Sequence, residues 1–386
     1  MRRAKHRWRA VGQRNISGTM RYSRMPIEVE SPEELGYGNI RFNLSESSIA
    51  DQTLADFGLT VPGDLVLLYG EHQGSPALRE LIAADGEGLS ADDVLVCGGA
   101  AGALFIVATA LLGKDDNSVV VRPNYATNLE TPRAIGCDIS FIDLKFEDGF
   151  ALDPERIAQA ITPATKLVSI TAPHNPTGTC VSEAELRRIA DITAERGVLL
   201  LVDETYRELA HGEPLPIAAS LGRHIISVSS LSKAFGAPGL RVGWLISTDP
   251  VMQEVFLAAK EQMNICGSVI NEWVAEGILR RKGDFLMRTR AEWRRRLDRI
   301  AQWIGNEEQL EWVRPAGGVV CFPRMKTPPP GGTDAFYRRL LQDHGTYVGP
   351  GHWFEMPDTH FRLGYAWPTM EELEGGLAGI SATLRG

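Results

Sequence analysis

The chain of 386 residues is poor in cysteine and contains no paired cysteine motif. Its five cysteines lie far apart, and no two of them form a CxxC pair: Cys97, Cys137, Cys180, Cys266 and Cys321. This odd and scattered set is typical of neither a disulfide framework nor a zinc site. We therefore expect no metal centre, and the free thiols favour a reducing cytoplasm as the location of the protein.

Long hydrophobic runs are also missing. No segment approaches the roughly 18 apolar residues that a membrane-spanning helix requires, so we expect no membrane as partner. The formal net charge of −9 argues against nucleic acid and anionic membrane surfaces as partners. No GxGxxG motif follows the first expected strand, which excludes a Rossmann-type oxidoreductase.

Positive charge is nevertheless concentrated at the start of the chain. Residues 1–25 carry eight Arg or Lys and no Asp or Glu, and they lack the apolar segment of a secretory signal. This composition predicts a disordered basic arm. The arm is too short for a helix-turn-helix, which disfavours a DNA-binding regulator.

Short apolar runs alternate with helical patterns from about residue 94 onward. The runs include VLVC, SVVV, KLVSIT, VLLLV and HIISV, which are almost continuous in Val, Ile and Leu. Strands of this kind are buried on both faces, so the pattern predicts an α/β domain with a mostly parallel sheet flanked by helices. We expect this large domain over residues 51–284, and a smaller α+β domain built from residues 26–50 and 285–386.

Polar residues with chemical uses follow these strands in the sequence. They are Asn175 after KLVSITAPH, Asp203 and Tyr206 after VLLLV, and Lys233 and Arg241 after HIISVSS. Taken singly, each has an ordinary explanation as a helix cap, a turn residue or a surface charge. Because the carboxyl ends of parallel strands meet at one edge of a sheet, we expect these side chains to form one site.

This set of residues suits a ligand with a pyridine ring, an aldehyde and a phosphate. Lys233 supplies the amine that forms a Schiff base with the aldehyde. Asp203, buried beside the ring nitrogen, keeps that nitrogen protonated so that the ring accepts electrons. Asn175 and the Tyr206 hydroxyl match the phenolate oxygen of the ring, and Tyr125 of RPNYATN offers an aromatic face for stacking.

The phosphate of such a ligand needs positive charge and hydrogen-bond donors. Arg241 supplies the charge, and the backbone amides of Ala100 and Ala101 lie at the expected start of a helix. The loop GGAAG carries no hydroxyl group, so the expected hydroxyl donors are Ser230 and Ser232.

Three motifs carry a resemblance to a known family. HNPTG, DETY and SSLSKAFGAPGLRVGW resemble the class I/II aminotransferase family of fold-type I pyridoxal phosphate (PLP) enzymes, and the likeness spans residues 40–384. The resemblance implies PLP as cofactor, with Lys233 as both the cofactor-binding lysine and the base that moves the Cα proton. It implies that Arg362 grips the substrate α-carboxylate with help from Asn175. It also implies a homodimer with its active sites at the subunit interface, in which Tyr69 reaches the phosphate of the neighbouring subunit.

The resemblance implies an aminotransferase that moves the amino group of an L-amino acid to a keto acid. A lyase, decarboxylase or cyclase of a modified amino acid is the alternative, because the same fold and cofactor serve these reactions. The region MNICGSVINEW carries no arginine of the kind that dicarboxylate-specific relatives use, so we expect a cationic or polar substrate side chain. Glu46, with Ser45 and Ser47 of NLSESS, is the expected substrate contact, and Asn264 and Glu71 are further candidates.

Overall fold

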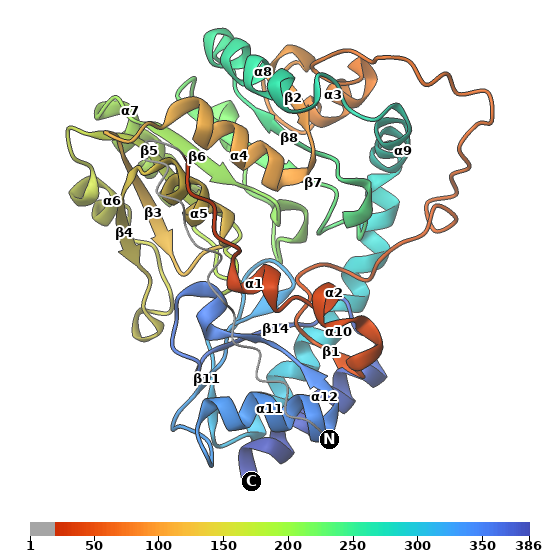
Figure 1. The fold of residues 1–386 in the computed structure, drawn as a ribbon, viewed down its shortest axis with the longest axis vertical. Helices are drawn as coiled ribbons and strands as arrows, with labels where there is room; N and C mark the ends of the chain where they lie inside the picture. Colours follow the sequence, from red (N-terminus) through yellow and green to blue (C-terminus); the bar gives the residue numbers. More distant parts are fainter. Residues whose placement is uncertain (1–19) are drawn as a thin grey trace.

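A computed structural model of the chain describes residues 20–386, so residues 1–19 of the expected basic arm lie outside the described residues. Two lobes are arranged along the long axis of the molecule (Figure 1). The larger lobe contains the central sheet. The smaller lobe brings together the N-terminal helices α1 (Pro26–Val29) and α2 (Pro32–Leu35) and the C-terminal part of the chain.

The large lobe is organised around a seven-stranded sheet. In spatial order its strands are β2 (Val94–Cys97), β8 (Gly243–Ile246), β7 (Ile225–Ser230), β6 (Leu199–Asp203), β5 (Thr165–Thr171), β3 (Asn117–Arg122) and β4 (Asp138–Asp143). Neighbouring strands of this sheet run parallel, except that β8 is antiparallel to both β2 and β7. The mostly parallel sheet expected from the apolar runs is confirmed.

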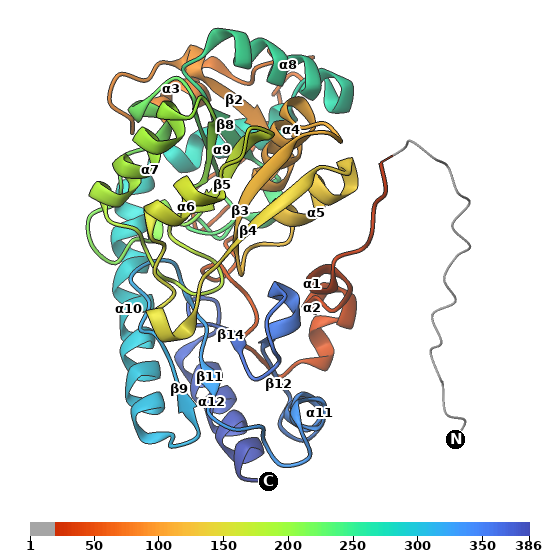
Figure 2. The same ribbon diagram turned by 90° about the vertical axis from the view of Figure 1, so that its left-hand side faces the viewer.

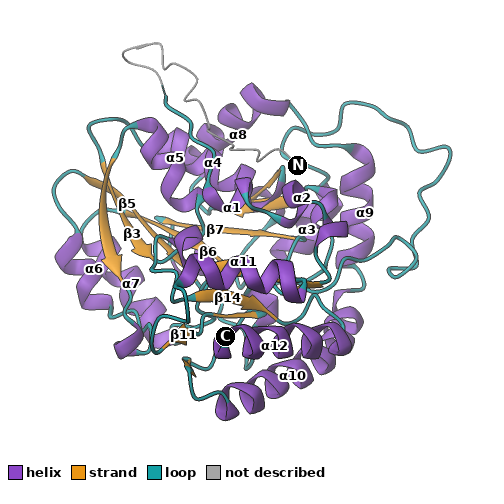
Figure 3. Ribbon diagram, turned by 60° about the horizontal axis from the view of Figure 1, so that its bottom comes forward, coloured by secondary structure: helices purple, strands orange, loops and turns teal. Residues whose placement is uncertain are grey.

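Helices cover both faces of this sheet, and Figure 3 shows the strands lying between them. One face packs against α4 (Gly99–Leu111) and α8 (Pro250–Asn264), and the other packs against α6 (Pro154–Ala160) and α7 (Glu183–Glu195). The remaining helices of this lobe are α3 (Pro76–Ala83), α5 (Thr127–Ile135) and α9 (Val269–Leu279). Along β6, Leu200 and Val202 belong to one apolar cluster and Leu201 to the other, which explains why VLLLV is apolar throughout.

The small lobe combines short strands with long helices. Its elements are β1 (Phe42–Asn43), β9 (Leu310–Glu311), β10 (Val320–Cys321), β11 (Arg324–Met325), α11 (Thr333–His344), β12 (Thr346–Tyr347), β13 (Gly349–Pro350), β14 (Phe361–Gly364) and α12 (Met370–Arg385). Strand β1 pairs in parallel with β12, which joins the N-terminal segment to the C-terminal part. Helix α10 (Lys282–Asn306) runs from the large lobe along the small one (Figure 2), so the expected domain boundary at residue 285 falls in its first turn.

Helix α10 is the longest helix of the described chain, with 25 residues, and it is rich in arginine. Neither this helix nor any other within residues 20–386 is both long and apolar enough to cross a lipid bilayer.

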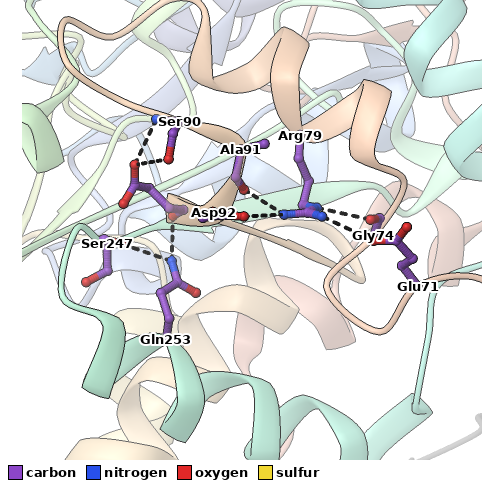
Figure 4. Close-up of polar contacts among 9 residues, drawn as sticks. Glu71, Gly74, Arg79, Ser90, Ala91, Asp92, Ser247 and Gln253 are labelled. Carbon is purple, nitrogen blue, oxygen red and sulfur yellow. Dashed lines mark hydrogen bonds and ion pairs between the residues drawn. The ribbon is translucent and has the colours of Figure 1, made fainter.

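A long segment between β1 and α3 extends away from the body of the protein and returns to it (Figure 1). Its return is anchored by the buried side chain of Arg79, which donates to Gly74 O (3.1 Å) and Ala91 O (2.8 Å) and pairs with Glu71 (3.2 Å; Figure 4). Gly74 has a φ of +111°, and a Cβ atom there would lie 2.5 Å from Val96, so glycine is required. The base of the extended segment is therefore held firmly against the large lobe.

Candidate active site

A cavity of about 200 Å³ is lined by residues of both lobes. Most of the site residues expected from the sequence line it: Lys233, Asp203, Tyr206, Ala100, Ala101, Tyr125, Asn175, Ser230, Ser232, Arg241, Arg362 and Glu46. The strand ends of the parallel sheet therefore meet at one place, and the small lobe contributes Arg362 and Glu46 from the opposite side.

Lys233 lies in the turn that follows β7. Its Nζ donates a hydrogen bond to Ser47 Oγ at 3.0 Å. Burial, and to a smaller extent the positive charge of Arg362, lower the pKa of Lys233. A lower pKa increases the share of the neutral amine, which is the form that attacks a carbonyl carbon or accepts a proton.

Asp203 is the last residue of β6, and only 4% of it is exposed. Its Oδ1 accepts hydrogen bonds from the backbone N of Thr205 (3.1 Å) and from the Thr205 hydroxyl (2.5 Å). Burial raises the pKa of Asp203 above its ordinary value, and the bonds from Thr205 oppose this rise. A positively charged ligand group in the cavity would stabilise the ionised form of this carboxylate.

The start of α4 faces the same cavity. Helix α4 begins at Gly99, so the amides of Ala100 and Ala101 belong to its first turn. A Cβ atom on Gly99 would lie 2.5 Å from Arg241 Nη2, and one on Gly243 would lie 2.6 Å from Ala100 N. The two glycines therefore allow the guanidinium and the helix start to approach closely. This combination of a cation with free backbone N–H groups binds anions such as phosphate.

Arg362, on β14, is fixed deep in the wall of the cavity. Its Nη2 donates to Ser45 O (2.7 Å) and its Nη1 donates to Asn175 Oδ1 (3.3 Å). Its guanidinium carbon lies 5.1 Å from the ring centroid of Phe354 and 5.9 Å from that of Trp353. Arg362 Nε is buried and has no hydrogen-bond partner among the described residues. The guanidinium thus keeps a donor available for a ligand carboxylate.

The hydroxyl of Tyr206 is buried and also has no partner among residues 20–386. Burial raises the pKa of Tyr206 to about 12, so the group remains a protonated donor at neutral pH. A buried hydroxyl without a partner costs about 1–3 kcal/mol. Since Tyr206 lines the cavity, an acceptor atom of a bound ligand within reach of the hydroxyl would remove that cost.

Three residues named from the sequence lie elsewhere. Tyr69 is 79% exposed on the extended segment, and neither Asn264 nor Glu71 lines the cavity. Asn264 is the last residue of α8, and Glu71 is engaged by Arg79 at 3.2 Å. Asn264 and Glu71 are therefore not substrate contacts within their own chain.

Two acidic residues of the cavity wall, Glu28 and Glu33, are not among those expected from the sequence. They belong to α1 and α2, two helices of only four residues each. The local signals for these helices are present, because proline starts both and the Ser31 hydroxyl accepts from Glu34 N at 3.4 Å. Such signals predict a short helix but not the part of the molecule on which it lies.

Contacts with the small lobe hold this N-terminal segment beside the cavity. Glu30 Oε2 accepts from Trp353 Nε1 (2.8 Å) and contacts His352 Nε2 (2.9 Å), and the Tyr347 hydroxyl donates to Glu30 O (2.6 Å). The bond to Glu30 raises the pKa of His352 to about 9, so the imidazole is charged at neutral pH and forms an ion pair with Glu30. The acidic residues on either side of Glu30 are thereby fixed at the cavity.

Comparison with known proteins places the chain in a family. It matches the family of class I and II aminotransferases over residues 36–380, and it therefore belongs to this family. The chain is 30% identical to the capreomycidine synthase of Streptomyces vinaceus over 360 residues, which cover 90% of this chain and 91% of that protein. It is also 30% identical to the arginine–pyruvate transaminase AruH of Pseudomonas aeruginosa over 313 residues, which cover 77% of each protein.

Solved structures give the same result for the fold. A PLP-dependent aminotransferase from Streptococcus suis matches with a TM-score of 0.85 and 28% identity, covering 92% of this chain and 96% of that one. The PLP-dependent cyclase OrfR matches with a TM-score of 0.84 and 31% identity, covering 96% of this chain and 99% of that one. The protein has the fold of the fold-type I PLP enzymes, and pyridoxal phosphate is its cofactor.

The cavity fits this cofactor on three counts. The buried Asp203 carboxylate suits the protonated ring nitrogen. The Tyr206 hydroxyl, which has no partner among the described residues, suits the phenolate oxygen. The close approach of Arg241 to the start of α4 suits the phosphate.

Proposed function

We propose that the protein is an aminotransferase that removes the amino group of an L-amino acid and passes it to a keto acid. The observation that carries the proposal is that Lys233, Asp203 and Arg362 line one cavity. Arg362 would bind the α-carboxylate of the amino acid. Lys233 would form the covalent link to the cofactor and then move the proton of Cα.

When bound, PLP supplies an aldehyde that condenses with amines and a protonated ring that withdraws electrons from Cα. The residues of this chain would orient both partners. Asp203 would hold the proton on the ring nitrogen, and Tyr125 would stack on the ring. The small lobe would cover the opposite side of the cavity and exclude water from it.

Replacement of Arg362 by alanine is expected to raise KM for the amino acid by about 100-fold and to lower kcat by less than about 10-fold. The reason is the loss of a charge-assisted pair with the α-carboxylate. Initial rates at a series of amino acid concentrations measure both constants. Arg362→Lys, which keeps the charge without the fork geometry, is expected to fall between the wild type and the alanine variant.

Arg187→Ala is the matched control, because this arginine lies in an exposed ion pair with Glu183 on α7. It is expected to leave both constants unchanged. An unchanged KM in Arg362→Ala, with the fold intact by circular dichroism, would place the carboxylate site elsewhere.

A second candidate function is the cyclisation of an amino acid or an elimination from it. It is favoured by the matches to capreomycidine synthase and to the cyclase OrfR, which cover 90% and 96% of this chain. Both candidates begin with the loss of the Cα proton. They differ in the bond that reacts next, which a few pocket side chains determine.

A single-turnover experiment without an acceptor separates the two candidates. Holoenzyme is mixed with one amino acid at a time, with arginine included because one relative is named an arginine–pyruvate transaminase. Transamination is expected to release one keto acid per subunit and to leave the amino group on the cofactor. Release of ammonia or a cyclic amino acid, with the cofactor spectrum regained, would instead support the second candidate, and release of carbon dioxide would support a decarboxylase.

We also propose that the active protein is a homodimer in which Tyr69 contributes to the neighbouring active site. The support is the extended segment of Figure 1, where Val66, Leu67, Leu68 and Tyr69 are all more than half exposed. Apolar side chains in such a row are typical of a surface that another chain covers. Sedimentation equilibrium would give twice the chain mass of 42.3 kDa, and a monomer at the working concentration would contradict the proposal.

A further inference from the structure

Three carboxylates of the N-terminal segment line the active-site cavity. Glu28 belongs to α1, Glu33 to α2, and Glu46 follows β1. Figures 1 and 2 show α1 and α2 at the junction of the two lobes. We call these three residues the acidic wall. The residues suited to the cofactor come from the large lobe, so the acidic wall faces the space left for the substrate.

In the proposed function, no cation of the cavity remains to pair with the acidic wall. Its cations are Lys233, Arg241 and Arg362. In the proposed function Arg241 is neutralised by the phosphate and Arg362 by the α-carboxylate, and Lys233 is bonded to the cofactor. The fourth carboxylate, Asp203, faces the ring nitrogen. The acidic wall is thus left with three negative charges and no positive group of the cofactor to meet them.

Glu46 is the central member of the wall. It is partly buried, and burial raises the pKa of Glu46, with Lys233 and Arg362 acting in the opposite direction. The charges of both Lys233 and Arg362 lower the pKa of Glu46. A positive charge on a substrate held between these two residues would therefore also interact with the Glu46 carboxylate. Burial of a carboxylate is unfavourable unless a partner compensates it, so a cationic partner is expected there.

The hydrogen bonds of Glu46 leave room for that partner. Tyr37 Oη donates to Glu46 Oε1 at 3.3 Å, and Asn43 Nδ2 donates to the same oxygen at 3.4 Å. Within residues 20–386, Oε2 receives no hydrogen bond, and no residue of the acidic wall forms an ion pair with a cationic side chain. The neutral donors orient the carboxylate without neutralising it.

A separate observation shows that the cavity is built for a polar ligand. Arg362 and Tyr206 are at least 96% buried, and Arg362 Nε and the Tyr206 hydroxyl have no partner among the described residues. Both side chains line the same cavity as the acidic wall. A ligand that satisfies Arg362 with its carboxylate is fixed at one end, so the acidic wall is left for its side chain.

We propose that the substrate is an L-amino acid whose side chain ends in a cation, a guanidinium or an ammonium, which the acidic wall binds through Glu46. The proposal rests on the proposed function, because it uses Arg362 as the carboxylate site. Glu46 makes the direct contact, while Glu28 and Glu33 are exposed and add a negative potential that salt screens.

The test compares L-arginine with L-citrulline, in which a neutral urea group replaces the guanidinium at nearly the same size. Wild-type holoenzyme is expected to prefer arginine by about 30-fold in kcat/KM, and Glu46→Gln to reduce this preference by about 10-fold or more. The rate with citrulline is expected to change by less than about 3-fold. Glu183→Gln, an exposed carboxylate of α7, is the matched control and should keep the wild-type preference.

The unreactive pair 5-guanidinopentanoate and 5-ureidopentanoate gives a second readout by calorimetry, since neither compound has an α-amine. Tighter binding of the guanidino compound, lost in Glu46→Gln, supports the proposal even if turnover is slow. Equal binding of the two compounds to the wild type would overturn it. Should Glu46→Gln fold poorly, Glu28→Gln/Glu33→Gln replaces two exposed residues and is expected to weaken the same preference, most strongly at low salt.

The cationic substrate and the proposed function can be disproved separately. If arginine and citrulline react equally well in a Lys233-dependent manner, the cationic substrate is wrong and the proposed function stands. If no amino acid loses its Cα proton and the guanidino compound still binds through Glu46, the proposed function is wrong and the acidic wall remains a cation site.

Discussion

Replacement of Lys233 by alanine is expected to lower kcat by about 10⁴-fold or more, because in the proposed function Lys233 is both the covalent link to the cofactor and the base at Cα. No other amine of the described chain lines the cavity. Single-turnover kinetics with excess holoenzyme measure the loss directly. The alanine variant is expected to keep some cofactor, since Arg241 and the start of α4 are unaffected.

The control for this variant is Lys114→Ala, which removes an exposed lysine in the loop after α4. It is expected to retain full activity. Turnover in Lys233→Ala at more than about one-tenth of the wild-type rate would remove Lys233 from both of its roles, because general base catalysis alone contributes about 10²–10⁴-fold.

Replacement of Asp203 by asparagine is expected to lower kcat by about 100-fold. The isosteric amide keeps an oxygen for the hydrogen bonds from Thr205 but carries no charge. An opposite charge beside a titrating nitrogen shifts its pKa by about 1–3 units, so its loss leaves the ring mostly unprotonated. The absorption spectrum of the bound cofactor across a pH series measures that shift independently of turnover.

The fold is expected to tolerate this change. Burial already disfavours the charged form of Asp203, as the direction of its pKa shows, so a neutral side chain at the same place should change the free energy of unfolding by less than about 1 kcal/mol. Asp298→Asn, at an exposed position on α10, is the matched control. A wild-type rate in Asp203→Asn, with the fold intact, would mean that another group protonates the ring.

The sheet and the cofactor side of the cavity are predictable from the sequence for a physical reason. A strand buried on both faces must be apolar along its whole length, as VLLLV is, and the residue that follows it is then placed at the sheet edge. Asp203 and Lys233 are predictable in this way, because each follows its own strand. Arg241 instead precedes β8, and the antiparallel direction of β8 brings the start of that strand to the same edge of the sheet.

The substrate side of the cavity could not be predicted in the same way. Glu28 and Glu33 lie there beside Glu30, which contacts Tyr347 and His352, 317 and 322 positions away in the sequence. No local pattern in the segment PIEVESPEEL predicts contacts with residues so distant in the sequence. Glu71 is the opposite case, a residue that the sequence suggests for the site but that lies outside it. Its charge suggests a substrate contact, but its carboxylate pairs with the buried guanidinium of Arg79.

Borohydride reduction tests whether Lys233 carries the cofactor. Holoenzyme is reduced with sodium borohydride, digested and mapped by mass spectrometry. We expect a phosphopyridoxyl group on the peptide containing Lys233, at close to one group per subunit, and none on that peptide in Lys233→Ala. A reduced cofactor attached to a different lysine, or an unmodified Lys233 in fully loaded enzyme, would contradict it.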